Sequence, residues 1–289
     1  MTHTVPKKIL LNEQAELRSG WKLAAYFATF IVIWVAAGIT LSLFVPADIL
    51  DNQLALLALN EIALIVPAVV CILLMVKFVD HRPLKTFGLT LENAKRHLAG
   101  GIALAALMLV ILVAGSYAFG YVHIEWTAGQ APGGMLVMTL LVLLLAAMVE
   151  ELMFRSFPLQ VLCEGIGKWP GVLVLSGLFG LVHLGNPNAA ALGTVNTVLA
   201  GVLLSLAYLK ARSVWLPYAI HVGWNVGIGY ILGLPLSGLD LPSLWTTGVA
   251  GSDFILGGAY GPEGGLLATF VFGSAALIVH RRNWNGRTP

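Results

Sequence analysis

The sequence predicts an all-α integral membrane protein with eight transmembrane helices and with both termini in the cytosol. Three features support this prediction: the composition, the number of long apolar stretches, and the distribution of basic residues. Hydrophobic residues make up 58% of the 289 residues and charged residues only 10%, whereas a soluble domain carries roughly 25% charged residues. This chain has too few polar groups to cover a water-exposed surface, so a bilayer is expected to surround most of it.

Eight stretches approach the length of about 20 apolar residues that a transmembrane helix needs. They are expected at residues 22–45, 54–77, 98–121, 134–162, 169–185, 189–209, 213–233 and 264–280. The fourth is long enough to project beyond the membrane. The chain is therefore expected to have a cytosolic tail at 1–21, one polytopic membrane domain at 22–280, and a second cytosolic tail at 281–289.

The basic residues give the predicted orientation, because loops rich in Lys and Arg stay in the cytosol. With a cytosolic N-terminus, every Lys and Arg falls in a cytosolic segment except Arg155, which lies in the cytosolic half of span four. The predicted outer loops hold no Lys or Arg. Their acidic residues are Asp48, Asp51, Glu125, Asp240, Asp253 and Glu263. We expect a multi-pass protein of the plasma or inner membrane, and no charge run suggests binding to nucleic acid.

Span four contains three charged residues, Glu150, Glu151 and Arg155. A charged side chain at the bilayer centre costs at least roughly 2.5–3.5 kcal/mol, so such residues need a reason. Glu151 and Arg155 are four residues apart, share a helix face and can pair. Glu150 is turned about 100° away, which leaves it free to act as a general base. The alternative is an ion network that only packs helices.

Two later spans contribute His183, His221 and Asn225. Spans four and five are predicted to form a hairpin that turns near residues 165–167, which places Glu150 about 22 Å and His183 about 24 Å from the turn. His221 and Asn225 share a helix face, and an amide beside an imidazole suits an oxyanion hole. His221 is only about 12 Å from the start of its span, so its level matches only if the hairpin projects about 10 Å or span seven tilts.

Other polar residues in the predicted spans are expected to have structural roles. Asn60 and Glu61 on span two, and Thr194 and Asn196 on span six, are predicted to form interhelical hydrogen bonds. The break at residues 186–188 is expected to line a hydrated cavity, because a helix break at membrane depth is otherwise costly. The Gly-rich stretch at 248–265 is predicted to be a flexible or re-entrant loop.

These motifs resemble the CPBP group, which comprises the CAAX-processing endopeptidases and the bacteriocin-processing and self-immunity proteins. The resemblance rests on Glu150-Glu151-x-x-x-Arg155, Phe179-x-x-x-His183 and His221-x-x-x-Asn225, in this order on three separate spans. It covers roughly residues 140–230, and the segment at 82–88 before span three is also similar. It implies an intramembrane endopeptidase with a catalytic core at about 134–233 and a site open toward the cytosolic side.

The resemblance also implies a role for each motif residue. Glu150 would activate water and His183 would hold or polarise it. His221 and Asn225 would stabilise the oxyanion, and Glu151 with Arg155 would brace the helix. No cofactor is favoured, but zinc is an open alternative with Glu150, His183 and His221 as ligands, since a catalytic zinc site needs three protein ligands. The metal-free interpretation is favoured because Asn225 suits an oxyanion hole better than it suits zinc.

Three functions are compatible with these sequence features. The first is a protease for membrane-associated peptides, with a leader peptide or a prenylated peptide as partner. The second is a non-enzymatic scaffold or self-immunity protein that keeps the motif for structure. The third is a transporter, which is disfavoured because no paired broken helices or repeated halves are visible. A serine nucleophile is also disfavoured, because no Gly-x-Ser-x-Gly motif is present.

Overall fold

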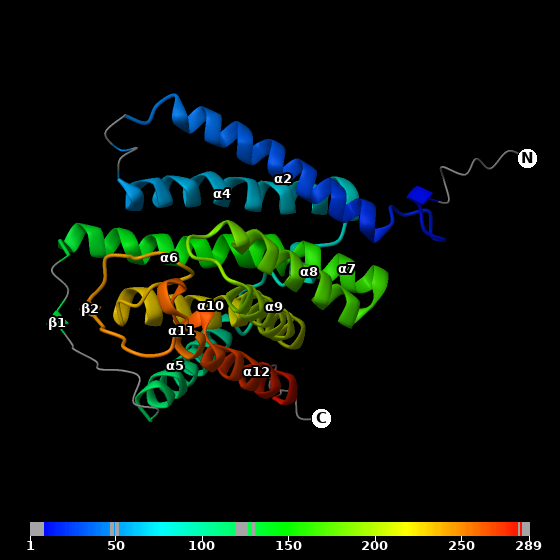
Figure 1. Cartoon of the computed structure of the whole chain (residues 1–289). Helices are drawn as coiled ribbons and strands as arrows, with labels where there is room; N and C mark the ends of the chain where they lie inside the picture. Colours follow the sequence, from blue (N-terminus) through cyan, green and yellow to red (C-terminus); the bar gives the residue numbers. More distant parts are fainter. Residues whose placement is uncertain are drawn as a thin grey trace, which may run out of the picture.

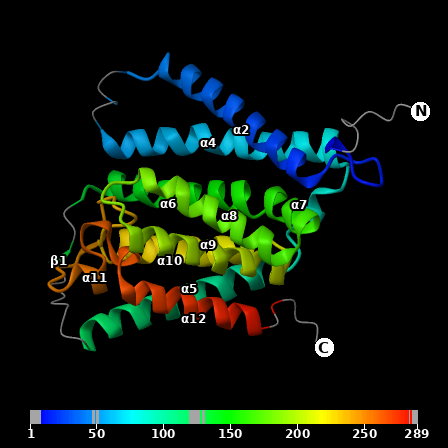
Figure 2. The same cartoon turned by 45° about the vertical axis from the view of Figure 1, so that its right-hand side comes forward.

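The computed structural model describes residues 9–46, 49, 52–118, 127–128, 131–282 and 284. The described part is a helical bundle in which α2 and α4 form one layer, α6 lies beneath α4, and α5 and α12 lie on the far side of α9 and α10 (Figures 1 and 2). Asp48, Asp51, Glu125 and Arg287, which the predicted topology uses, lie outside the described residues, as do residues 1–8 and 285–289 of the predicted tails.

Each predicted span corresponds to a helix or a helical pair. The α-helices are α2 (Ser19–Ser42), α4 (Gln53–Met75), α5 (Ala94–Ala118), α6 (Gly133–Phe154), α7 (Phe157–Ile166), α8 (Lys168–Val182), α9 (Ala191–Ala211), α10 (Trp215–Asn225), α11 (Asp253–Leu256) and α12 (Leu266–Arg281). Two π-helices continue longer helices, η1 (Val76–Asp80) after α4 and η4 (Val226–Ile231) after α10.

Six helical segments of the described chain are long and apolar enough to cross a membrane. They are Ser19–Ser42, Gln53–Asp80, Ala94–Ala118, Gly133–Ile166, Lys168–Gly185 and Ala191–Ala211. The last two predicted spans are shorter as helices, because α12 has only 16 residues and α10 ends at Asn225 before η4. The structure therefore confirms an all-helical protein with several possible membrane spans, and the count of eight spans remains a prediction.

The predicted fourth span is broken into α6 and α7 at Arg155 and Ser156. Ser156 has φ −68° and ψ −110°, which is not helical, and Pro158 lies in the first turn of α7. A proline cannot donate a helical hydrogen bond and its ring clashes with the preceding turn, so the helix restarts here. At the other end of α7, Gly167 has a φ of +92°, a left-handed conformation that glycine adopts easily, and the chain turns into α8.

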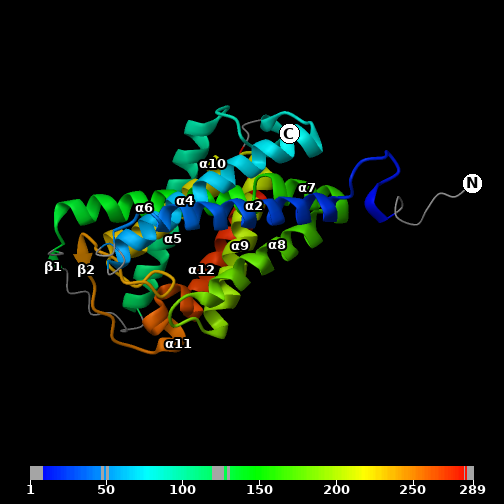
Figure 3. The same ribbon diagram turned by 90° about the horizontal axis from the view of Figure 1, so that it is seen from above.

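The two ends of the bundle differ. The first turn of α2, the last turn of α12, and α7 lie at one end, whereas β1, β2 and α11 lie at the other (Figures 1 and 3). At the α7 end, Asp80 accepts from Lys22 at 3.0 Å and also pairs with Arg82, whose guanidinium binds Glu164 at 2.8 Å. Asp80 and then Glu164 raise the pKa of Arg82. This network ties α2, η1 and α7 together.

The core beneath the site depends on close contact between α5 and α10. A methyl group on Gly101 would lie 2.5 Å from Ala219 Cβ and 2.8 Å from the Leu216 carbonyl oxygen. A methyl group on Gly223 would lie 2.7 Å from Ala105 Cβ. Small residues at these positions let the helix backbones approach, and this contact fixes α10, which carries His221 and Asn225.

Short strands and turns close the end opposite α7. β1 (Thr127–Ala128) pairs antiparallel with β2 (Trp245–Thr246). The predicted flexible or re-entrant loop at 248–265 forms α11, then the 3₁₀ turns η5 (Gly258–Tyr260) and η6 (Pro262–Gly264). Tyr260, Pro262 and Glu263 are buried, so the second half of this segment packs into the bundle.

Candidate active site

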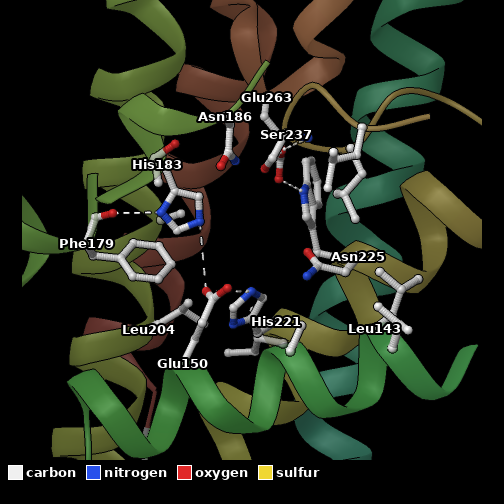
Figure 4. Close-up of a pocket in the computed structure, with 18 of the residues that line it drawn as sticks. Leu143, Glu150, Phe179, His183, Asn186, Leu204, His221, Asn225, Ser237 and Glu263 are labelled. Carbon is white, nitrogen blue, oxygen red and sulfur yellow. Dashed lines mark hydrogen bonds and ion pairs between the residues drawn. The ribbon is translucent and has the colours of Figure 1, made fainter. Parts of the chain in front are cut away.

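A cavity of about 270 Å³ lies inside the bundle. Its lining includes four of the predicted site residues, Glu150 from α6, His183 after α8, and His221 and Asn225 from α10. Figure 4 shows Glu150 rising from α6 between the two imidazoles, with Asn225 beyond His221. The structure thus brings together polar residues from three separate helical segments. Glu151 and Arg155 lie behind this wall and are fully buried.

Glu150 is the carboxylate that faces the cavity. Its side chain is 27% exposed, and its Oε2 atom is buried without a hydrogen-bond partner in the described structure. The same Oε2 lies 3.9 Å from His183 Nε2 and 3.7 Å from His221 Nε2. Both distances are too long for direct hydrogen bonds. Glu150 is therefore placed between two imidazoles without being bonded to either.

His183 is oriented by Phe179, one turn earlier in the chain. His183 Nδ1 lies 2.7 Å from the Phe179 carbonyl oxygen, and the two rings are 4.6 Å apart. A carbonyl oxygen only accepts, so Nδ1 must carry the proton. In the neutral ring, Nε2 then presents a lone pair toward Glu150. The Phe-x-x-x-His spacing thus fixes both the orientation and the tautomer of His183.

His221 is oriented by the second glutamate of the pair. Glu151 Oε1 accepts from His221 Nδ1 at 2.9 Å and pairs with Arg155 Nη1 at 3.4 Å. The Arg155 guanidinium also lies 4.2 Å from the Phe179 ring centre, a cation–π contact in a buried site. The predicted Glu151–Arg155 pair is present. The bond between Glu151 and His221 joins two helices, and residue spacing within a single helix does not predict it.

Two imidazole nitrogens consequently face the carboxylate at the centre of the cavity. Because each Nδ1 donates its proton to an acceptor, His183 Nε2 and His221 Nε2, 3.9 and 3.7 Å from Glu150 Oε2, accept a hydrogen bond when their ring is neutral and donate one when it carries both protons. Polar groups separated by more than about 3.5 Å are commonly bridged by a donor such as water. The geometry suits a molecule that donates hydrogen bonds to a carboxylate and an imidazole together, which is what a hydrolytic water does.

Asn225 completes this wall from the C-terminal end of α10. Its side chain points into the cavity near His221 (Figure 4). The chain changes from α-helix to the π-helix η4 immediately after it, and π-helical turns are frequent at functional sites. The amide is thus positioned as a hydrogen-bond donor beside the imidazole.

The mismatch in depth that the sequence suggests for His221 is explained by the break after α6. Ser156 Oγ donates to the Phe87 carbonyl at 3.1 Å, and Val214 N donates to the next carbonyl, that of Gly88, at 3.2 Å. These bonds set Ser156 and Val214 at the same level. Glu150 is then about 9 Å and His221 about 10 Å from that level, at roughly 1.5 Å per residue. The ten residues of α7 extend beyond it.

The far wall of the cavity is built around Glu263. The sequence predicted only that this residue lies in an outer loop. Glu263 Oε1 accepts from Trp224 Nε1 at 2.9 Å, and Oε2 accepts from Ser237 N at 2.8 Å and Ser237 Oγ at 2.5 Å. Asn196 Nδ2 donates to its carbonyl at 2.8 Å. Glu263 therefore holds the 248–265 segment against α9 and α10, next to Asn225.

The other polar residues of the spans behave differently from one another. Asn196 makes the predicted interhelical bonds, to the carbonyls of Glu263 and Gly265 and to Thr269. Thr194, in contrast, donates to Ala190 near the start of its own helix. Asn186 lines the cavity as expected for the helix break (Figure 4).

The cavity is lined by loop residues on one side and closed by buried residues on the other. The loop residues in the lining are Asn186, Ser237 and Glu263, and their loops contact one another at the end of the bundle where α11 lies, opposite α7 (Figure 1). On the α7 side of Glu150, Phe154 and Ser156 are buried, as is Arg155. The opening toward the cytosolic side remains a prediction.

Glu150, His183 and His221 are the residues that would hold a zinc ion in this site. Two imidazoles and a carboxylate are ligands that zinc accepts, and each Nδ1 is held by a partner as in many zinc sites. Within the residues that the structure describes, however, no three His, Cys, Asp or Glu side chains are grouped so that they could hold a metal ion. The zinc alternative and the metal-free interpretation both remain predictions.

Part of the chain, including the site residues, matches a protein family model. Residues 132–227 match the family model described as type II CAAX prenyl endopeptidase, Rce1-like. The matched segment, about a third of the chain, runs from the start of α6 into η4 and contains all six predicted site residues. No curated protein matches the chain. The match confirms, over residues 132–227, the predicted resemblance to the CAAX-processing endopeptidase family, and the helices long enough to cross a membrane agree with a multi-pass protein.

Proposed function

We propose that this chain is an intramembrane endopeptidase in which Glu150 activates the attacking water. The observation that carries the proposal is the position of Glu150 Oε2, buried, unbonded, and within 3.9 Å of two imidazole Nε2 atoms. A structural carboxylate would be expected to have a partner, as Glu151 has. Glu150 has instead been left with acceptors around it, which suits a group that receives a proton during the reaction.

The proposed reaction gives a role to each of the six predicted site residues. A water held between Glu150 and His183 attacks the scissile carbonyl carbon, and Glu150 takes its proton. The oxyanion that forms accepts hydrogen bonds from the Asn225 amide and from His221 Nε2 when that ring carries both protons. Glu150 then passes its proton to the amide nitrogen, the C–N bond breaks, and a carboxylic acid and an amine are released while Glu150 returns to its ionised form. Glu151 and Arg155 hold His221 but do not touch the reacting atoms.

The proposed substrate is a peptide that is associated with the membrane, either prenylated or of the leader type. The proposal also retains eight spans, cytosolic termini, and a site in the plasma or inner membrane that opens toward the cytosol. The segregation of basic residues supports this orientation. Labelling of single cysteines placed in the loops before α5 and after β1 would test it, since the proposal puts these loops on opposite sides of the membrane.

The function is tested by peptide cleavage with the protein purified in detergent. Wild type, Glu150→Ala and His221→Ala are compared on a quenched peptide library, each with and without a strong chelator. We expect cleavage by the wild type, its loss in both variants, and no effect of the chelator. Cleavage retained in both variants would overturn the site. Loss on chelation that zinc restores would overturn the metal-free mechanism. An inert wild type would instead favour the scaffold or self-immunity role.

A further inference from the structure

Glu61 on α4 forms a further wall of the proposed active-site cavity. Its side chain lines the cavity together with Asn60, and the residue is only 8% exposed. The two views in Figures 1 and 2 show α4 lying along α6, the helix that carries Glu150. Asn60 Nδ2 donates to Glu61 Oε1 at 3.3 Å. The predicted interhelical hydrogen bond is thus replaced by a contact between neighbours, and the carboxylate is presented to the cavity.

Glu61 differs from the other buried acids of the described structure in what surrounds it. Asp80 pairs with Lys22 and Arg82, and Glu151 pairs with Arg155. Glu263 has no cation, but both of its oxygens accept hydrogen bonds. Glu61 receives one bond from an amide, and the charge that acts on it is that of Glu150, which repels it.

The cavity supplies no permanently charged cation to pair with Glu61. Its described lining contains carboxylates, amides, imidazoles, hydroxyls and apolar side chains, but no Lys or Arg. A carboxylate in a membrane span costs roughly 2.5–3.5 kcal/mol. A peptide N–H could be bound by an amide or a carbonyl without this cost. Glu61 and Glu150 line the same cavity, and two carboxylates that share a site ionise together more readily when a cation is bound with them.

We propose that Glu61 is a specificity-determining residue that receives a basic side chain of the peptide substrate close to the scissile bond. This inference rests on the proposed proteolytic function, because it places the basic side chain in the same cavity as Glu150. Asn60 holds one carboxylate oxygen and leaves the other for the ammonium or guanidinium group. The apolar lining, which includes Leu57, Val142 and Leu143, then surrounds the aliphatic part of that side chain.

Cleavage of matched peptides tests this assignment. One series carries Lys in turn at each of the residues flanking the cleaved bond, and the second carries norleucine, which has a similar shape without the charge. Hydrogen bonds to charged groups imply that wild type prefers Lys at one position by roughly 10- to 100-fold in kcat/KM. In Glu61→Gln, which keeps the shape and one acceptor oxygen but removes the charge, the ratio should fall to about 1. Glu61→Lys should favour a peptide with Glu at that position.

Controls separate this claim from a structural role and from the proposed function. Ser116→Ala, on α5 and outside the cavity lining, should keep the wild-type ratio. A ratio that persists in Glu61→Gln would overturn the proposal, and so would the absence of any Lys preference in the wild type. If the wild type cleaves nothing, the proposed function fails. Binding of the same peptides with a reduced, uncleavable bond then decides the role of Glu61 alone, by whether the Kd ratio depends on it.

Discussion

Glu150 and Glu151 are neighbours in the sequence but lie in two very different regions. Glu151 is 0% exposed and lies on the sealed side of α6, where it contacts Arg155 and His221. Glu150 is on the cavity side, with its Oε2 unbonded between two imidazoles. On the sealed side the charges are matched within the chain. On the cavity side the described lining gives Glu150 no Lys or Arg partner, and this is the side where the proposed water and substrate would bind.

Removal of Arg155 should disrupt the ion pair with Glu151 on the sealed side of α6 and give the largest loss of stability. Arg155→Ala leaves Glu151 as an uncompensated buried charge, which typically costs about 3–5 kcal/mol. The free energy of unfolding, measured by denaturant titration in mixed micelles, should fall by this amount. The double variant Arg155→Met with Glu151→Leu should recover much of the stability, because both charges are removed together. A similar loss in the double variant would contradict the pairing.

Removal of the Asn225 amide should affect the cavity side without affecting the sealed side. Asn225→Ala removes a donor to the oxyanion, a change that costs roughly 10²- to 10³-fold in kcat in comparable sites. KM and the melting temperature should change little. Asn196→Ala is the matched control, because that amide is buried and bonds only to the far wall and Thr269. It should reduce stability instead, and an equal fall in kcat for both variants would remove the special role of Asn225.

Glu263 should give the smallest effect of the three, because it acts on the cavity only through the residues that it holds. In Glu263→Gln the amide oxygen can still accept from Trp224, but the NH₂ group then meets the Ser237 N–H, donor against donor. An unsatisfied buried group costs about 1–3 kcal/mol. Ser237→Ala removes only one of the bonds to Glu263 and should cost less. Hydrogen exchange of residues 252–265 should rise in Glu263→Gln, and unchanged exchange would show that Glu263 does not hold this segment.

Much of the fold and the site could be predicted because the bilayer restricts what the sequence can do. The length of the apolar stretches placed a helix or a helical pair in each predicted span, and the i, i+4 spacing predicted the pair of Glu151 with Arg155. Contacts that cross between helices could not be predicted from spacing. The bond from Glu151 to His221 depends on the close packing of α10, and that of Glu263 to Trp224 depends on a loop folding back. The level of His221 depended on the break that Pro158 imposes after α6, which a continuous apolar run conceals.

The most direct test compares Glu150→Gln with Glu151→Gln, measuring peptide cleavage and thermal unfolding on the same samples. Both variants replace a carboxylate with an amide of the same shape, one on each side of α6. We predict that Glu150→Gln loses roughly 10²- to 10⁴-fold in cleavage rate, the range for a general base, while its melting temperature stays near that of the wild type. Glu151→Gln should be clearly destabilised. Cleavage at the wild-type rate by Glu150→Gln would contradict the account.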